Sequence, residues 1–579
     1  MKRKNLFLSL ISSILVAVAI VTVTIVSVIQ PKSNNSGKLP DAGNININKP
    51  GDESVDNSTL YDFENKFNRN GSAELPYIIY SADNFVSMLS ERGGVRRLVT
   101  RPVTENVVGE NGNIITVNKV DENGHVIFEA VLDKNGNNIY DVNHFELVND
   151  IDFTGVDYVT LFNGSSFIGK LNGKGYSIKN ISINVNEDNY ASKFSFERAG
   201  NKYARVALFG ETDGAVIENI TIDALSVNVS NVVYNSIREA KYGIYVELMV
   251  AGVAGYARNT TLSNVTLNAN VIGSNYSVDD VDGNGNYIAE NAMGGVVAVA
   301  ENLTLNKTNV NVDVTVNAGS SYYVGGIAAY GRTAKVEESN IDVEIITTAS
   351  RRLSMAGMFA YGRKLDIQNT IVNFTLTDTA DAQTRNDYVA TLTKDGTAKS
   401  ANMSTAAGLV AILRANDDSQ KTLISKVKVT SNVNFDCIYA GAVLDTYSTC
   451  DKNVEANKQL ITLSDIIVDV NANALAIHAF ARQLVATTVS FSEVANSNGY
   501  FNIKIAGNAK LTAYVTKIDA STSVTREAVT ILTAADKTFM DYHYTDLYIQ
   551  TTSSINSSLM TGFDRWSIVA NSFGSYKVV

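Results

Sequence analysis

Apolar and polar residues alternate along much of the chain from about residue 140 onward. In one segment the apolar positions are Ile217, Ile220 and Ile222, and in another they include Ile341 and Val343. A period of two is typical of strands with one face buried, because successive side chains of a strand point to opposite faces. No long helical periodicity separates these segments, which argues against alternating strands and helices. The pattern predicts an all-β fold of many short strands.

A short motif of Gly, Ala and other small residues recurs between the alternating segments. Its central residues are 31 to 51 positions apart, in the series Leu208, Gly252, Gly295, Gly326, Gly357, Gly408 and Gly441. Such self-similarity indicates a solenoid whose repeats stack on one another. Coils of about three short strands would bury Val, Ile and Leu, and Gly would fit where backbones turn tightly or pack closely. We predict a right-handed parallel β-helix over residues 144–579, with closing coils at its C-terminal end.

Residues 71–99 carry the signals of a cap for the N-terminal end of this solenoid. Ser81 is a helix N-cap residue, and Phe85, Met88 and Leu89 follow at helical spacing. We expect an amphipathic helix that covers the open end, since that end otherwise presents unpaired strand edges.

Residues 100–143 separate this cap from the first coil. Asn-Gly pairs fall at 111–112, 123–124 and 135–136, twelve residues apart, between alternating strands. Asn-Gly between such strands is a hairpin signal. We predict a protruding β-meander, which serves either in recognition, as exposed loops on rigid scaffolds often do, or as a decorative insertion.

The N-terminus has the pattern of a membrane anchor. Basic residues at 2–4 precede an uncharged run over 6–29, long enough to span a bilayer, which needs about 20 apolar residues. The positive-inside rule places the rest of the chain outside the cell. We predict a single transmembrane signal-anchor helix within residues 1–30, the alternative being a cleaved signal peptide. Residues 31–70 are polar and hold three of the five prolines, which predicts a disordered linker.

The opening motifs of the predicted solenoid resemble those of a known family. They comprise Pro76, Tyr77, Phe145, Leu147, Asn149, Asp150, Ile151, Asp152, Phe167, Gly169, Gly173, Gly175, Ile178, Asn180, Leu208, Phe209 and Gly210. Over about residues 71–500 the chain is similar to bacterial surface β-helix proteins of the GLUG-repeat and adhesin-like type. It departs from their pattern at Ile181, where Leu is usual. The resemblance implies a role in binding at the cell surface or in the envelope, and it supplies no catalytic residues.

The charge balance narrows the choice of partners. The formal net charge is −11, which disfavours nucleic acid, because phosphate contacts need a clustered excess of Lys and Arg. One local basic cluster consists of Arg92, Arg96, Arg97 and Arg101. It is either a solvated loop or a site for an anionic polymer.

Metal and cofactor sites are not indicated. Cys437 and Cys450 provide one disulfide or two unpaired thiols, and with four histidines in the chain they do not suggest a zinc site. Residues 280–285 match the first six positions of an EF-hand-type loop, but its twelfth position is Asn291 where a bidentate acid is needed. We interpret that loop as a polar surface loop, with a weak calcium site as the alternative. We predict no metal and no cofactor.

Catalytic patterns are also missing from the sequence. Glycoside hydrolysis needs two facing carboxylates, whereas the acids on strand-rich segments are isolated, namely Asp223, Glu338, Asp342 and Asp366. The Gly-rich stretch 171–177 is better explained as a strand turn than as a phosphate loop, because no helical pattern follows it. We predict that the protein is not an enzyme and has no catalytic residues.

Tyrosine is abundant, with 27 Tyr against one Trp. Several tyrosines flank the small-residue motifs and are candidates for a ladder that stacks on sugars, or else for ordinary half-buried strand residues with the hydroxyl in water, namely Tyr322, Tyr323, Tyr330, Tyr361 and Tyr439.

Together these patterns predict a non-catalytic, adhesin-like binding protein, held by a single-pass anchor in the cell membrane with most of the chain extracellular. Its partners would be the membrane, through the N-terminal helix, and a glycan or a host or matrix ligand, but no nucleic acid. The alternatives are a carbohydrate-active β-helix enzyme, either a polysaccharide lyase or a glycosidase, and a structural surface stalk.

Overall fold

The computed structural model describes most of the chain between residues 57 and 443 and isolated strands beyond it. Contacts divide the chain into Met1–Val55 and Asp56–Val579, and every described residue belongs to the second unit. The predicted membrane anchor therefore lies outside the described residues. In the described part, no helix combines the length and hydropathy needed to cross a membrane. The longer described stretches are 57–109, 111–198, 201–230, 246–274, 290–317, 322–347, 353–383, 404–414, 421–435 and 461–474.

Two helical segments and a strand open the described part of the chain. They are α2 (Ser58–Phe63), the π-helix η1 (Glu64–Asn68) and β1 (Tyr77–Ile79). The buried Asn65 amide accepts a hydrogen bond from the Ile78 N–H and donates one to the Ile78 carbonyl, at 2.7 and 2.8 Å. Because Asn65 pairs with β1 in this way, the predicted disordered linker is wrong for residues 58–68.

Helix α3 (Ala82–Arg92) begins where the sequence predicts. The Ser81 hydroxyl accepts a hydrogen bond from the Asn84 N–H at 3.1 Å, which satisfies one of the unpaired N–H groups of the first turn. Phe85 and Leu89 are fully buried in the same apolar cluster as the interior of the coils, and Met88 packs against it. The helical spacing of these apolar residues is thus confirmed.

The insertion after α3 is a set of nested antiparallel strand pairs, here called the arm (residues 96–142). β2 pairs with β7, β3 with β6 and β4 with β5, so one long strand segment meets three partners in turn instead of forming a simple meander. The three Asn-Gly pairs lie at turns, with positive φ at Gly112, Gly124 and Gly136. The strands are β2 (Arg96–Leu98), β3 (Thr100–Pro102), β4 (Thr104–Val108), β5 (Ile114–Asn118), β6 (Phe128–Ala130) and β7 (Tyr140–Val142).

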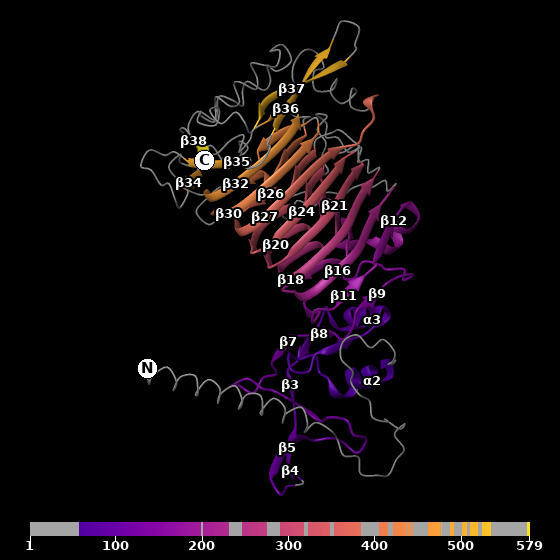
Figure 1. Ribbon diagram of the computed structural model, residues 1–579. Coiled ribbons are helices and arrows are strands. Elements are labelled where there is room, and N and C mark those ends of the chain that lie inside the picture. Colours follow the sequence, from indigo (N-terminus) through magenta and orange to yellow (C-terminus); the bar gives the residue numbers. More distant parts are fainter. Residues whose placement is uncertain are drawn as a thin grey trace, which may run out of the picture. The chain divides into compact units, whose positions relative to one another are not determined.

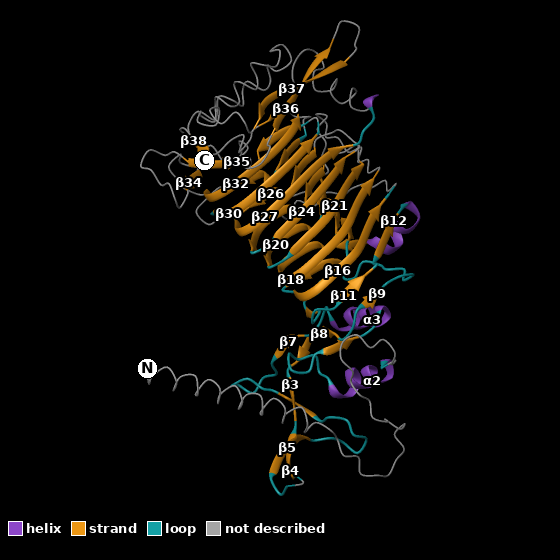
Figure 2. Ribbon diagram, in the orientation of Figure 1, coloured by secondary structure: helices purple, strands orange, loops and turns teal. Residues whose placement is uncertain are grey.

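Beyond the arm, strands from successive coils lie side by side and pair in parallel (Figure 1). Strands predominate throughout this region, with two short helical segments beside β12 (Figure 2), α4 (Glu187–Asn189) and η2 (Tyr190–Phe194). One sheet contains β1 together with β8 (His144–Leu147), β9 (Ile151–Asp152), β10 (Lys170–Asn172), β11 (Ser177–Lys179), β12 (Ser182–Val185), β15 (Phe209–Asp213), β16 (Val216–Val229), β18 (Ala254–Ser274), β20 (Val297–Asn306), β21 (Asn309–Asn317), β23 (Ala328–Glu337), β24 (Asn340–Thr347), β26 (Phe359–Arg363), β27 (Leu365–Asp378), β29 (Val410–Arg414), β30 (Thr422–Asn434), β32 (Ile461–Ala474), β34 (Thr487–Ser490), β35 (Phe501–Ile505), β36 (Lys510–Ile518), β37 (Val524–Thr533) and β38 (Tyr576–Val578).

A second sheet consists of short strands that precede the small-residue motifs. Its strands pair in parallel except for the β13–β14 hairpin, and in the first sheet β36 and β37 also pair antiparallel. Its members are β13 (Ser195–Arg198), β14 (Asn201–Val206), β17 (Val246–Ala251), β19 (Glu290–Gly294), β22 (Tyr322–Gly325), β25 (Leu353–Ala356), β28 (Thr405–Ala407), β31 (Ile438–Gly441) and β33 (Ala476–Ile477).

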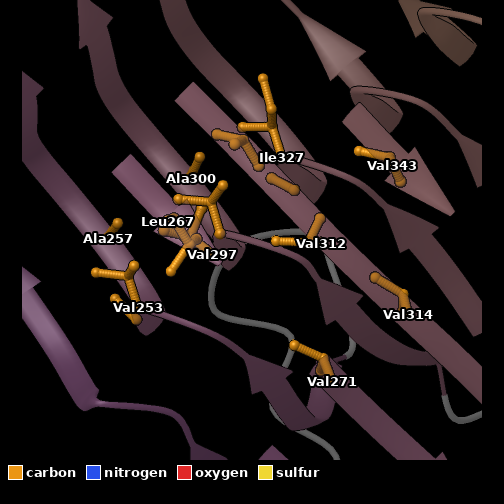
Figure 3. Packing of buried hydrophobic residues seen from close by; sticks show 14 of the residues in the cluster. Val253, Ala257, Leu267, Val271, Val297, Ala300, Val312, Val314, Ile327 and Val343 are labelled. Carbon is orange, nitrogen blue, oxygen red and sulfur yellow. The ribbon is translucent and has the colours of Figure 1, made fainter. Parts of the chain in front are cut away.

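Apolar side chains of successive coils form columns in the interior (Figure 3). In one column, parallel register aligns Val271, Val314, Ile345, Leu376 and Val433, and each is buried. Burial of such a side chain contributes about 1.5–3 kcal/mol. The predicted mostly-β fold with stacked parallel strands is confirmed, and the arrangement is compatible with a parallel β-helix.

Glycines form a second column at the corner between the two sheets. A Cβ added to Gly252, Gly295, Gly326 or Gly357 would lie 2.2 to 2.5 Å from the carbonyl oxygen of the next glycine, the last being Gly408. The close backbone approach predicted for these positions is therefore confirmed.

The two ends of the predicted glycine series are displaced by one residue. Phe209 pairs with Ala254, which places Leu208 level with Val253 and not with Gly252. At the other end Gly441 pairs with Ala407, one position before the glycine column. The motif therefore gives the order of the coils correctly, but it sets the register only within the interior coils.

A column of left-handed turn residues separates two strand segments of each coil. Asn219, Asn264, Lys307, Glu338, Asn369 and Lys426 have φ between 48° and 54°. Asparagine tolerates this conformation better than most residues, and its amide also bonds along the column. Asn264 donates to Asn219 at 2.9 Å, and Asn219 donates to Asn172 at 3.3 Å. These ladders tie one coil to the next at its bend.

Candidate functional site

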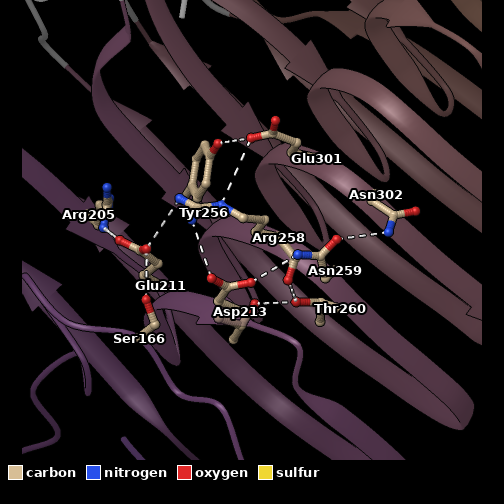
Figure 4. Close-up of polar contacts among 11 residues, drawn as sticks. Ser166, Arg205, Glu211, Asp213, Tyr256, Arg258, Asn259, Thr260, Glu301 and Asn302 are labelled. Carbon is tan, nitrogen blue, oxygen red and sulfur yellow. Dashed lines mark hydrogen bonds and ion pairs between the residues drawn. The ribbon is translucent and has the colours of Figure 1, made fainter. Parts of the chain in front are cut away.

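A group of charged side chains lies just beyond the glycine column on three neighbouring coils (Figure 4). These residues, here called the corner cluster, are Arg205, Glu211, Asp213, Tyr256, Arg258 and Glu301. Parallel pairing brings them together, because Glu211 is level with Tyr256 and Asp213 with Arg258. Arg258 is level in turn with Glu301 on the next coil. The cluster thus combines residues that are 43 to 45 positions apart in the sequence.

Glu211 is the buried centre of the corner cluster. The Arg205 Nη1 lies 2.5 Å from its Oε2, and the two side chains are 7% and 4% exposed. The Ser166 hydroxyl donates to the other carboxylate oxygen at 2.7 Å, and Arg258 approaches that oxygen to 3.7 Å. Two guanidinium groups and a hydroxyl therefore compensate a carboxylate that has lost most of its contact with water.

Arg258 links the three coils. Its guanidinium lies 3.3 Å from Asp213 and 4.0 Å from Glu301, whose carboxylate also accepts a hydrogen bond from the Tyr256 hydroxyl. Burial lowers the pKa of Arg258, but Tyr256 and the neighbouring carboxylates outweigh this effect, so the net pKa is raised. Burial and the carboxylate of Glu301 raise the pKa of Tyr256 as well. Arg258 therefore stays charged, and Tyr256 neutral, over the physiological pH range.

The corner cluster is better suited to joining coils than to acid–base catalysis. Hydrolysis of a glycoside needs one carboxyl group that is held protonated while the other is ionised. All three carboxylates of the cluster are instead ion-paired with an arginine, at 4.0 Å or less. The arrangement instead neutralises charge between adjacent coils.

Sequence reasoning missed the corner cluster, although a signal was present. Glu211, Tyr256 and Arg258 look isolated in the sequence because each has its partner one coil away. Alignment of the coils from Phe209 and Ala254 would have placed these residues in contact. The one-residue shift at Leu208 conceals that alignment.

The candidate tyrosine ladder is formed in part. The ring centroids of Tyr323 and Tyr330 are 4.7 Å apart, and those of Tyr330 and Tyr361 are 5.7 Å apart. The Arg414 guanidinium lies 5.3 Å from the Tyr361 ring. Tyr330 is only 2% exposed, because it belongs to a second apolar cluster with alanines of neighbouring coils, such as Ala298. Its ring contributes to packing and offers little surface for stacking on a sugar.

One of the candidate tyrosines, Tyr439, does not extend this row. Tyr439 is fully buried in the main apolar cluster and level with Ala406, so neither the sugar-stacking ladder nor the half-buried tyrosine with its hydroxyl in water holds for it. It points inward because strands alternate faces and the position it occupies on β31 is an interior one. The side chain of Tyr322 lies outside the described residues.

The predicted basic cluster is dispersed over a helix and two strands, and two of its four charges are paired with carboxylates. Arg97 lies 3.7 Å from Asp141, and Arg101 lies 2.7 Å from Glu129. All four residues belong to α3, β2 and β3 and not to a loop, namely Arg92, Arg96, Arg97 and Arg101. With arm carboxylates beside two of them, the arrangement does not favour an anionic polymer.

The acids that were considered as catalytic candidates do not form a pair. Asp223 and Asp342 belong to one column, but Asn268 and Asn311 stand between them. Glu338 occupies a left-handed turn, where it lies 3.7 Å from Lys307. Asp366 lies on β27, at a position level with a lysine of the preceding coil.

The remaining candidates concern metals and phosphate. Residues 280–285 and Cys450 lie outside the described residues, so calcium binding by that loop and the pairing of Cys437 remain untested. Among the described residues no group of three or more His, Cys, Asp or Glu side chains is placed to hold a metal ion. Residues 171–177 form the turn between β10 and β11, with φ of 89° at Gly175, as the strand-turn interpretation predicts.

Most of the exposed large hydrophobic side chains in the described part of the chain lie on the arm. The described residues include eight exposed large hydrophobic side chains. Six of them lie on the arm, and a seventh, Val95, immediately precedes it. Val108 and Ile114, at the end of the β4–β5 hairpin, are 74% and 73% exposed. The eighth, Ile371, lies alone on a coil. Clustered apolar exposure of this kind marks an interaction surface more often than scattered exposure does.

Comparison with known proteins does not identify a family. A scan of protein-family models found no match to this chain, and a search of curated proteins found none either. The resemblance to GLUG-repeat and adhesin-like surface proteins therefore remains a prediction from sequence motifs.

Proposed function

We propose that this protein is a non-catalytic, adhesin-like binding protein whose stacked coils form a right-handed parallel β-helix capped by α3. In this proposal the segment within residues 1–30 anchors the chain in the membrane, and the coils are displayed outside the cell. The coils serve as a rigid scaffold, and the arm makes contact with the ligand.

The clustered apolar residues of the arm are the observation that carries this proposal. Leu132 and Tyr140 are 52% and 55% exposed. Apolar side chains in contact with water do not stabilise the fold, so their exposure on one insertion indicates a binding surface. Recognition residues are often found on insertions that a rigid scaffold positions. Because these side chains are mostly aliphatic, they suit the apolar core of a protein interface, which favours a host or matrix protein over a glycan.

The arm can be removed at its base, although this also removes the stacking of His125 on Phe67 and the hydrogen bond that Asn70 donates to Thr100. The Asn143 amide donates to the carbonyls of Arg92 and Val95, at 2.7 and 3.2 Å, so the two ends of the arm lie side by side. We suggest replacing residues 96–142 by a short Gly-Ser linker in the full chain. Binding to a panel of immobilised matrix proteins and glycans would then be compared with that of the native chain.

We expect the deletion to abolish binding while far-UV circular dichroism still shows the strands of the coils, and the unfolding midpoint falls because the contacts of His125 with Phe67 and of Thr100 with Asn70 are lost. Leu132→Asn should weaken binding, and Ile371→Asn, an exposed apolar residue of a coil, should leave it unchanged. Unaltered binding after deletion would contradict the proposed role of the arm. Release of sugar or of an unsaturated uronate in the same assay would instead support the carbohydrate-active alternative.

A further inference from the structure

The hairpin at the end of the arm stands as a two-stranded sheet. β4 and β5 pair antiparallel, and in the described part of the chain neither strand has a second neighbour. A two-stranded hairpin is marginally stable in water, and three or more strands are needed for independent stability. The open edges and the exposed Val108 and Ile114 therefore leave this hairpin suited to receive a further strand.

The two edges of the hairpin differ in their chemistry. β4 follows Pro102 and carries Glu105, and both features discourage pairing with a further strand. β5 has the sequence Ile-Ile-Thr-Val-Asn, with no charge and no proline, and four of its five residues are β-branched. Such residues favour strands, so β5 is the unprotected edge.

The hydrogen-bond pattern shows which groups of β5 point outward. The Gly109 N–H donates to the Asn113 carbonyl and the Lys119 N–H donates to the Val103 carbonyl, both at 2.7 Å. Hydrogen-bonded and non-hydrogen-bonded pairs alternate along an antiparallel ladder. Thr116 therefore occupies a non-hydrogen-bonded position, and its own N–H and C=O point away from β4.

We propose that β5 pairs antiparallel with β5 of a second copy of this chain, across a twofold axis at Thr116. In this register Ile115 of each copy lies opposite Val117 of the other copy. The two Thr116 residues face each other. No charged residue meets another, because β5 has none. The edges left outside are the two β4 strands with Glu105, so the assembly closes as a dimer instead of growing into a fibre.

The dimer should be weak in dilute solution. A single five-residue strand pair buries far less than the roughly 1,200 Å² of a stable interface. It would form at high local concentration, as for copies confined to one cell surface. This inference goes beyond the proposed function, because it requires β5 alone and not the capture of a ligand.

Matched cysteine variants of the full chain test the proposed pairing. Thr116 and Asn106 lie opposite each other in the hairpin, and the Thr116 hydroxyl donates to the Asn106 side chain at 2.9 Å. Thr116→Cys and Asn106→Cys therefore lose the same hydrogen bond but place the thiol on opposite edges. Facing residues on paired strands are close enough for a disulfide, which tolerates Cα separations of about 4.4–6.8 Å.

Under mild oxidation of cells that display the full chain, we expect a disulfide-linked dimer for Thr116→Cys. The native chain and Asn106→Cys should give none, which controls for the native cysteines. Equal crosslinking of both variants, no dimer for Thr116→Cys, or a crosslink to a different protein would each overturn the proposal.

A charge variant separates this inference from the proposed function. Thr116→Lys places two like charges face to face, and we expect it to abolish the concentration-dependent increase in mass of the purified chain in sedimentation experiments. Asn106→Lys should leave that increase intact, and circular dichroism verifies the fold of both. Thr116→Lys leaves Leu132 and Tyr140 in place, so ligand binding should survive. A dimer that persists in Thr116→Lys would contradict the inference. The effect of arm deletion on ligand binding tests only the proposed function and not the dimer.

Discussion

At the scale of single residues, two positions of each coil determine how closely the coils stack. The glycines at the corner let the backbones of adjacent coils approach until only a hydrogen atom fits between them. The turn residues near Asn264 adopt a left-handed conformation, and asparagine adds a hydrogen bond along the column. Both requirements concern the backbone, so one side chain added at the wrong position would disturb two coils.

Gly326→Ala should destabilise the protein strongly. Its Cβ would lie 2.2 Å from the Gly357 carbonyl oxygen and 2.3 Å from a Val343 methyl group, so the coils must separate. We expect a loss of about 3 kcal/mol, as for overpacking of a tight core, measured by urea unfolding. Gly109→Ala is the matched control, because its nearest contact would be 3.4 Å, and it should change stability by less than about 1 kcal/mol. Equal effects of the two substitutions would contradict the close approach of the coils.

Asp152 should make stability depend on pH in the acid range. Hydrogen bonds from Asn180 and Thr154 lower the pKa of its carboxyl group from 3.8 to about 2. A lowered pKa in the folded state means that this stabilisation is complete above pH 3.8 and is lost as the pH falls toward 2. Asn180→Gly removes the largest cause and tolerates the φ of 63° at this position, so acid unfolding followed by circular dichroism should begin at a higher pH. An unchanged acid transition would contradict this assignment.

At the scale of elements, the corner cluster joins strands of three coils by charge. Arg205→Met should leave Glu211 buried without its closest cation, and we expect a loss of about 3–5 kcal/mol. A second substitution, Glu211→Gln, should recover part of this loss, because it removes the uncompensated charge. Lys335→Met provides the control, since its ion pair with Glu337 is solvent-exposed and should contribute little to stability. Thermal unfolding of the variants, with the double variant included, measures these differences.

The sequence was sufficient to predict the strands, their stacking and the cap. Alternating Val and Ile residues indicate the buried face of each strand. Ser81 is the N-cap residue of α3, as predicted. The register near Leu208 could not be predicted, because a one-residue offset displaces the pairing from Phe209 to Ile222, and an irregularity before Leu225 restores it. The corner cluster could not be predicted for the same reason. The helical segments over 58–68 could not be predicted either, because Asn65 has its hydrogen-bond partner in β1.

At the scale of the whole molecule, each coil contacts mainly its neighbours, so the region grows by stacking strands in register. Columns such as Val271 and Val314 continue from coil to coil, and the polar ladders follow the same repeat. Stacking of this kind gives the coils a regular scaffold, and the arm is inserted between helix α3 and its first strand β8. The central claim is therefore that residues far apart in the sequence occupy one column at strand spacing.

Distances between spin labels on one column test this claim directly. Ser226, Asn270, Asp313, Glu344, Thr375 and Asn432 follow one another in register on successive coils. With one label at 432 and the other at 313, 270 or 226, the account predicts separations that increase by about 4.8 Å per coil, or about 14, 19 and 24 Å. Distances measured by pulsed electron paramagnetic resonance that do not increase by this constant step would contradict the stacked parallel arrangement.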